Sequence, residues 1–178
     1  LADAGVDAVI VQDMAVLHMP GGLSMECHAS TQTDNRTADK VLWLKSLGFC
    51  RVVLARELSV DEIREIHRAV PDVELEVFVH GALCVSYSGL CYASQYCFGR
   101  SANRGECAQF CRLAFDMVDA DGRVMEKSRH LLSLKDMNQI DNIEALADAG
   151  ATSFKIEGRL KDIVYVKNVT AAYSQRLD

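Results

Sequence analysis

The chain has 178 residues, of which 49% are hydrophobic and 25% are charged, which is ordinary usage for a globular domain with a hydrophobic core. No apolar run approaches the roughly 18 residues of a transmembrane helix, so we expect no membrane contact. The net charge of −6 argues against a wide basic surface for nucleic acid, but it allows a local basic patch.

Strand-like and helix-like segments alternate along the chain, which favours a parallel α/β architecture. The pentapeptide LADAG occurs at 1–5 and at 146–150, each time before a strand-like run, as expected where a helix ends at glycine. Ser59 and Glu62 form the pattern of a capping box at the start of a helix. The predicted strands are 6–12, 23–28, 51–55, 73–80, 130–135 and 152–157, and the main predicted helices are 35–48, 58–70 and 165–177.

Residues 82–129 interrupt this alternation and are interpreted as an insertion. Residues 82–112 are short of apolar runs and rich in cysteine, and residues 113–129 predict a β-hairpin that turns at Asp121 and Gly122. The expected organisation is one domain, with βα units at 1–81 and 130–178 on either side of the insertion.

The chain is predicted to form part of a (β/α) barrel of the TIM type rather than an open doubly wound sheet. No GxGxxG motif follows the first strand, and polar residues recur at the carboxyl ends of the strands, where barrels carry their chemistry. Because such barrels usually need about 250 residues, we expect a piece of a longer barrel protein, with the rest of that barrel as its partner. No basic segment followed by an apolar run opens the chain, so a signal peptide is not expected and the predicted location is the cytoplasm.

Seven cysteines are an unusual feature of this chain. Cys27 and Cys50 lie in apolar, strand-like runs and are interpreted as small buried hydrophobic residues. The odd total and the missing signal argue against a disulfide framework. The other five fall within the insertion and are Cys84, Cys91, Cys97, Cys107 and Cys111.

On spacing alone, three interpretations of the clustered cysteines stay open: an iron–sulfur cluster, a zinc site, and structural or free thiols. A catalytic nucleophile needs one thiol and a base rather than five thiols. An all-cysteine zinc site usually shows CxxC pairs, which this chain lacks. An iron–sulfur cluster accepts irregular spacing around a larger core, and glycines at 81, 89, 99 and 105 would let a loop wrap it.

The segment ELEVFVHGALCVSYSGLCYAS, residues 74–94, resembles the signature of the collagenase-like peptidase family U32. The matching positions are Glu76, Phe78, Gly81, Ala82, Leu83, Cys84, Gly89, Cys91 and Ser94, while Ala93 replaces a larger aliphatic residue. The segments CHASTQ, GRSANRGECAQFCR, LLSLKDMNQI and FKIEGRLKD also resemble the family, so the likeness covers nearly the whole chain.

The resemblance implies a function beyond the family's name. Some members carry a four-iron four-sulfur cluster and hydroxylate a base of ribosomal or transfer RNA, drawing on prephenate. By that likeness the ligands would be Cys84, Cys91, Cys107 and Cys111, with Cys97 spare, and the expected product is 5-hydroxycytidine in 23S rRNA or a tRNA equivalent. Zinc is the alternative metal.

Polar residues at the strand ends are the other candidates for a site. Lys155, Glu157 and Arg159 alternate and therefore share one face of a strand and its exit. They are catalytic candidates, because charges inside a barrel are costly unless they are paired or used. His28 is a further catalytic candidate, weighed against a packed histidine.

Substrate-binding candidates are His80, Lys135, Arg100 and Arg104. The two arginines lie among aromatic residues, a combination that suits single-stranded RNA but is equally typical of a solvated loop. His80 ends a strand just before the first cysteine, and Lys135 ends another.

Two other functions were weighed against RNA hydroxylation. A collagenase-like protease is the family's nominal activity, but the chain has no GxSxG or HExxH motif and offers only the pair Cys84 and His80 for a cysteine protease. A non-catalytic, metal-bearing module that binds RNA or protein is the second alternative.

Overall fold

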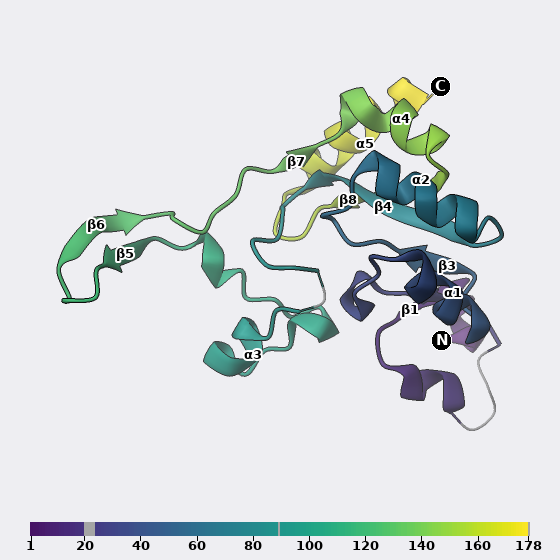
Figure 1. The fold of residues 1–178 in the computed structure, drawn as a ribbon, viewed down its shortest axis with the longest axis horizontal. Coiled ribbons are helices and arrows are strands. Elements are labelled where there is room, and N and C mark those ends of the chain that lie inside the picture. Colours follow the sequence, from purple (N-terminus) through teal and green to yellow (C-terminus); the bar gives the residue numbers. More distant parts are fainter. Residues whose placement is uncertain (20–23, 89, 178) are drawn as a thin grey trace.

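The computed structural model describes residues 1–19, 24–88 and 90–177 (Figure 1). The strands are β1 Ala8–Val11, β2 Glu26–Ala29, β3 Arg51–Val53, β4 Glu74–Gly81, β5 Phe115–Val118, β6 Val124–Arg129, β7 Met137–Asn138 and β8 Ala151–Glu157. The α-helices are α1 Ala38–Ser46, α2 Val60–Ala69, α3 Ala93–Phe98, α4 Ile143–Asp148 and α5 Ile163–Leu177. Short 3-10 helices are η1 Ala2–Ala4, η2 Met14–His18, η3 Thr31–Thr33, η4 Ala102–Arg104, η5 Phe110–Arg112 and η6 Ile140–Asn142.

The main sheet is mostly parallel. Strands β1, β2, β3 and β4 lie side by side in chain order, and β8 pairs parallel with β4 along most of its length. This arrangement confirms the expected α/β architecture. Within the residues described, the sheet stays open, because β1 and β8 each pair on one side only, so closure into a barrel remains a prediction.

Five of the six predicted strands of the main sheet are present, but the strand predicted at 130–135 is wrong. These residues form turns and lie exposed, with Leu131, Leu132 and Leu134 all more than 40% accessible. Their apolar spacing resembled a strand, yet no neighbouring strand pairs with them. The sheet instead gains the two-residue strand β7, which runs antiparallel to the end of β4. Residue 23 of the predicted second strand lies outside the described residues.

The two faces of the main sheet differ in character. One face packs against helices α1, α2, α4 and α5 through a core that includes Val41, Leu44, Val52, Leu75 and Ile143. Burying these side chains is the main stabilising contribution to the fold. The alternate residues on the strands point to the other face, which carries charged and polar side chains and leaves Ile10 55% accessible.

The main predicted helices are present, with ends that differ from the prediction by up to three residues. The capping box of Ser59 and Glu62 is confirmed at the start of α2, where each side chain bonds the other residue's backbone N–H. The hydrogen bonds from Ser59 lower the pKa of the Glu62 carboxyl. No helix in the described part of the chain is both long and apolar enough to cross a membrane.

Between β4 and β8 the chain leaves the sheet. It forms α3, η4 and η5, and then the hairpin β5–β6, which projects away from the sheet and its helices (Figure 1). The predicted hairpin is confirmed, and Asp119 holds its turn by accepting hydrogen bonds from the N–H groups of Asp121 and Arg123. The division of the chain at 82 and 129 stays a prediction.

Candidate active site

Four cysteines line one cavity of about 320 Å³ beyond the carboxyl end of β4. They are Cys84, Cys91, Cys107 and Cys111, the four that the family resemblance selects, and each is partly buried. Cys97 does not line this cavity and is exposed on α3. The structure therefore brings together the predicted ligand set and leaves the spare cysteine outside it, while the binding of a metal by these residues stays a prediction.

The separations of the four sulfurs bear on which metal would fit. All seven cysteines are free thiols, so no disulfide competes for them. No three of these four residues place their sulfurs within 4.8 Å of one another in the part of the chain described. Four thiolates on one zinc ion would lie about 3.8 Å apart, because Zn–S bonds are about 2.3 Å long. A single zinc ion would therefore require the segments that carry these cysteines to move closer together.

The electrostatics of Cys111 indicate that the thiols share one environment. Burial raises the pKa of the Cys111 thiol, Arg112 opposes the rise, and Cys107 and Cys84 add to it. Two other thiols are thus near enough to make its ionisation harder. A positively charged group bound among them would remove this penalty, since a metal ion favours the thiolate form.

Two further arginines and one carboxylate line the same cavity. Arg56 lies three residues after the end of β3, and its Nη2 donates to Oε2 of Glu157 at 3.2 Å. Its guanidinium carbon lies 3.7 Å from the centroid of the Phe78 ring, so the charged group lies over an aromatic face. Arg159 reaches Glu157 more loosely, with Nε 4.0 Å from Oε1. Of the three predicted residues at this strand end, Glu157 and Arg159 therefore meet at the cavity.

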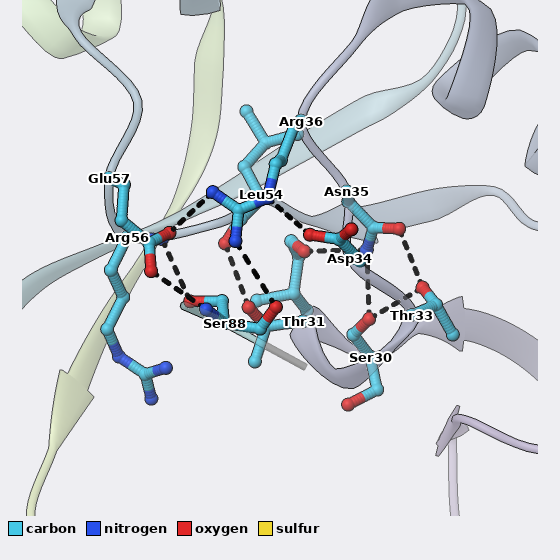
Figure 2. Close-up of polar contacts among 11 residues, drawn as sticks. Ser30, Thr31, Thr33, Asp34, Asn35, Arg36, Leu54, Arg56, Glu57 and Ser88 are labelled. Atoms are coloured by element: carbon cyan, nitrogen blue, oxygen red, sulfur yellow. Dashed lines mark hydrogen bonds and ion pairs between the residues drawn. The ribbon is translucent and has the colours of Figure 1, made fainter. Parts of the chain in front are cut away.

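The loop between Cys84 and Cys91 is anchored through Ser88, which is 2% accessible. Its backbone N–H donates to Oε1 of Glu57 at 2.8 Å, and its hydroxyl accepts from the N–H of Arg56 at 3.3 Å. Its carbonyl accepts from Nη2 of Arg36, whose Nη1 also pairs with Glu57. Figure 2 shows this network joining the ends of two strands to the cysteine loop. Gly89, the next residue of the family signature, lies outside the described residues.

A second anchor holds Arg36 and the turn before it. Asn35 is fully buried and donates to the carbonyls of Ser30 and Val53, each at 2.8 Å (Figure 2). Thr31 donates to the carbonyl of Leu54 at 3.2 Å. These bonds fix the segment after β2 against the end of β3. The Arg36 and Glu57 side chains that bond Ser88 therefore extend from backbone that is held in place.

Two more contacts fix the second pair of cysteines. Ser94 is 1% accessible and accepts from the N–H of Ala108 at 3.1 Å, with its hydroxyl 3.8 Å from the sulfur of Cys107. Arg112 donates from Nη2 to the carbonyl of Leu83 at 2.5 Å, and its Nη1 bonds the carbonyl of Leu134. The Arg112 side chain thereby ties the residue after Cys111 to the residue before Cys84.

Several predicted site residues lie elsewhere. Lys155 forms an ion pair with the buried Glu76 at 2.8 Å and is not among the residues that line the cavity. Lys155 lies two residues before the end of β8, and its ammonium group pairs with Glu76 of the neighbouring strand β4. Lys135 is exposed and does not line the cavity, because the strand expected to present it is absent.

The two histidine candidates are also separate from the cysteines. Nδ1 of His80 lies 3.3 Å from the hydroxyl of Tyr173, and no contact with Cys84 is present. His28 is 7% accessible and contacts Glu26, at 3.4 Å from Nε2 to Oε2. Both belong to packed polar contacts in this structure.

The two arginine candidates for RNA binding are not at the cavity wall. Arg100 is exposed, and its Nε donates to the carbonyl of Glu106. Arg104 is exposed at the end of η4 and lines a different hollow beside β1. Their role stays a prediction.

The residues that sequence reasoning left without a role are Arg56, Glu57, Arg36 and Ser88. The signal for the first two was present, because Arg56 and Glu57 directly follow the strand predicted at 51–55. No pattern in the sequence joins Ser88 to residues 31 and 52 positions earlier.

Comparison with known proteins places these residues in context. The model of Peptidase family U32 matches residues 1–178. The chain is 56% identical to the 23S rRNA 5-hydroxycytidine C2501 synthase of Escherichia coli K12, over 100% of this chain and 27% of that protein. It is 39% identical to tRNA hydroxylation protein P1 of Bacillus subtilis 168, over 100% of this chain and 44% of that protein.

A third relative carries a different name. The chain is 35% identical to a collagenase of Porphyromonas gingivalis, over 98% of this chain and 45% of that protein. The chain thus spans about a quarter to less than half of the length of these three relatives.

Proposed function

Because this chain belongs to peptidase family U32, we propose that it takes part in iron–sulfur-dependent hydroxylation of an RNA base. The observation that carries the proposal is the single cavity lined by four free thiols together with Arg56, Glu157 and Arg159. The names of two relatives, a 23S rRNA 5-hydroxycytidine synthase and a tRNA hydroxylation protein, support an RNA base as the substrate. The first candidate product is 5-hydroxycytidine in 23S rRNA.

The donor set of the cavity fits an iron–sulfur cluster. Thiolate is the ligand that such clusters require, and four free thiols line the one cavity. The residues that would hold it are Cys84, Cys91, Cys107 and Cys111. A bound cluster would supply one-electron redox chemistry at this position.

The chain's own charged residues would bind an anion beside the thiols. Replacing C–H by C–OH on a base removes two electrons and adds one oxygen atom, so the reaction needs an oxidant and an oxygen donor. Prephenate is the co-substrate that the resemblance to the family implies. Its carboxylates would meet Arg56 and Arg159, because a planar guanidinium can bond both oxygens of a carboxylate. Glu157 lies between the two arginines and would orient both.

The mouth of a closed (β/α) barrel is the setting we propose for this cavity. The parallel order of β1 to β4 and the position of the cavity beyond the end of β4 support it. RNA would approach past Tyr87, Tyr92 and Tyr96, which are exposed close to the cysteines in sequence and could stack on unpaired bases. A location in the cytoplasm follows from an RNA substrate.

A collagenase-like activity is favoured by one relative's name but not by the arrangement of side chains. A cysteine protease needs a base beside its thiol, and His80 bonds Tyr173 instead of Cys84. RNA hydroxylation is therefore the better supported function, and the protease and the metal-bearing binding module are outcomes of its test.

The test is mass spectrometry of nucleosides from ribosomal and transfer RNA of a strain that lacks the whole gene. We expect one hydroxylated pyrimidine to disappear, to return with the natural gene, and to stay absent with a gene that encodes Cys84→Ser. If the deletion leaves every hydroxylated nucleoside at its natural level, the RNA reading is wrong. Cleavage of gelatin by the purified natural protein, lost in Cys84→Ser, would then favour the protease.

A further inference from the structure

A second group of potential metal ligands lies at the amino ends of the strands, whereas the cysteine cavity lies beyond their carboxyl ends. Glu26 is the first residue of β2, His28 lies two residues further along the same face, and Cys50 directly precedes β3. Since β2, β3 and β4 are parallel, Glu26 and Cys50 lie at the amino ends of their strands, whereas Cys84 follows the carboxyl end of β4. The two groups are therefore separate sites.

The three ligand atoms are spaced as a tetrahedral zinc site requires. Oε2 of Glu26 lies 3.4 Å from Nε2 of His28 and 3.6 Å from Sγ of Cys50. With Zn–N and Zn–O bonds of about 2.0 Å and Zn–S bonds of about 2.3 Å, the tetrahedral edges are about 3.3 Å for N–O and about 3.5 Å for S–O. All three atoms lie within 4.8 Å of one another, so the ligands need only small shifts to close on one ion.

The charge around this group also favours a cation. The neighbouring Arg51 is turned to Glu74 and Glu76, so it does not neutralise Glu26. Within the described residues, Glu26 has no lysine or arginine partner and contacts only the His28 ring and the Cys50 thiol. A carboxylate beside a thiol raises the cost of ionising that thiol unless a cation binds between them.

The His28 ring is buried, whereas one side of the group formed by Glu26, His28 and Cys50 is open to solvent. His28 is 7% accessible, so its ring is held by packing before any ion arrives. The Glu26 side chain is 67% accessible, which leaves a path to solvent. One nitrogen, one sulfur and one oxygen ligand with a free fourth position are typical of zinc, which accepts all three ligand types.

We propose that Glu26, His28 and Cys50 bind a zinc ion, with the fourth coordination position open to water. This assigns a role to His28, which the cavity does not use, and to Cys50, which is only half-buried and does not behave as a core residue. The proposal does not depend on the function proposed for the cysteine cavity.

The test separates the two groups of thiols by cobalt binding. In a chain with Cys84, Cys91, Cys107 and Cys111 all changed to serine, circular dichroism first establishes folding, and Co²⁺ is then titrated under anaerobic conditions. We expect one equivalent to bind, with a thiolate-to-cobalt absorption band about a quarter as intense per ion as that of a four-thiolate site, because each thiolate contributes to the band. Adding Glu26→Gln or Cys50→Ser should weaken binding by at least about tenfold.

A second measurement serves if that chain does not fold. With the natural cysteines present, metal-depleted protein is saturated with Zn²⁺, and tightly bound zinc is counted. Cys50→Ser should bind one equivalent fewer than the natural chain, and Cys97→Ser, which changes an exposed thiol on α3, should bind the same number. If Cys50→Ser and Glu26→Gln both retain the natural number and affinity, the three residues form only a hydrogen-bonded group and the zinc proposal is overturned.

Discussion

Arg56 and Glu157 form an ion pair at 3.2 Å although they are 101 positions apart in the chain, and both are more than four-fifths buried. The pair joins the end of β3 to the end of β8 at the wall of the cysteine cavity. Arg56 Nε is buried without a hydrogen-bond partner among the described residues. An arginine that is pinned on Phe78 and only partly satisfied by Glu157 has donor capacity left for an anion.

We predict that Arg56→Lys and Arg159→Lys each lower RNA hydroxylation by about 10- to 100-fold in the full-length protein. Lysine keeps the charge but loses the fork that binds a carboxylate through two bonds, and one charged hydrogen bond is worth about 1.5–3 kcal/mol. The measurement is the fraction of hydroxylated nucleoside in a complemented deletion strain. Iron content should stay at the natural value in both variants, and thermal unfolding should stay unchanged in Arg159→Lys, because the Arg159 side chain is more exposed than that of Arg56. An unchanged fraction in either variant would remove that arginine from the site.

The cysteine assignment predicts a sharp division among five residues. Protein prepared anaerobically should be brown, and changing any of Cys84, Cys91, Cys107 or Cys111 to serine should remove most of its iron, because serine is a poor ligand for such clusters. Cys97→Ser is the matched control and should keep full iron and sulfide. Colorimetric iron and sulfide analysis checks this. Stoichiometric zinc without iron in the natural protein would contradict the assignment.

Much of the fold follows from local signals in the sequence. The core strands are short apolar runs, and helix α2 begins at a capping box that the sequence spells out. The segment 130–135 failed because its leucines imitate a strand, whereas no partner strand is in reach and Arg112 takes the carbonyl of Leu134 instead. Local spacing cannot predict which backbone groups a distant side chain will occupy.

The site divides in the same way. Glu157 could be selected from its position at a visible strand end, and five clustered thiols marked the region of the cavity, but the set of four ligands came from the resemblance to the family. The sequence could not show that Lys155, unlike Glu157, lies away from the cavity, because its ion-pair partner Glu76 is on another strand. Arg56 could not be selected from the sequence, because only its ion pair with Glu157 in three dimensions distinguishes it from any other arginine after a strand.

Glu57 is predicted to hold the cysteine loop rather than to react. Its carboxylate accepts the buried N–H of Ser88 and pairs with Arg36. Glu57→Ala therefore leaves the Ser88 N–H without a partner, whereas Arg36 keeps its ion pair with Asp34. We expect a loss of about 1–3 kcal/mol in the free energy of unfolding and a lower iron content after purification. Glu65→Ala, which removes an exposed carboxylate from α2, is the control and should change neither. Urea unfolding and iron analysis make the comparison, and natural iron retention in Glu57→Ala would show that the loop does not need this anchor.

Gly81, the last residue of β4, allows the closest backbone approach at the site. Its φ is +105°, and a Cβ there would lie 2.2 Å from the carbonyl oxygen of Glu157. Gly81→Ala should therefore cost about 1–3 kcal/mol from the clash in addition to about 1–2 kcal/mol from the backbone conformation. Gly48→Ala is the matched control, because its φ is +97° and no atom lies within 4 Å of a Cβ there. The control should show the conformational cost alone in urea unfolding.

Since the clash pushes directly on Glu157, Gly81→Ala should also lower hydroxylation at temperatures where it remains folded, whereas Gly48→Ala should not. Equal losses in the two variants would mean that the contact between Gly81 and Glu157 does not set the position of the carboxylate.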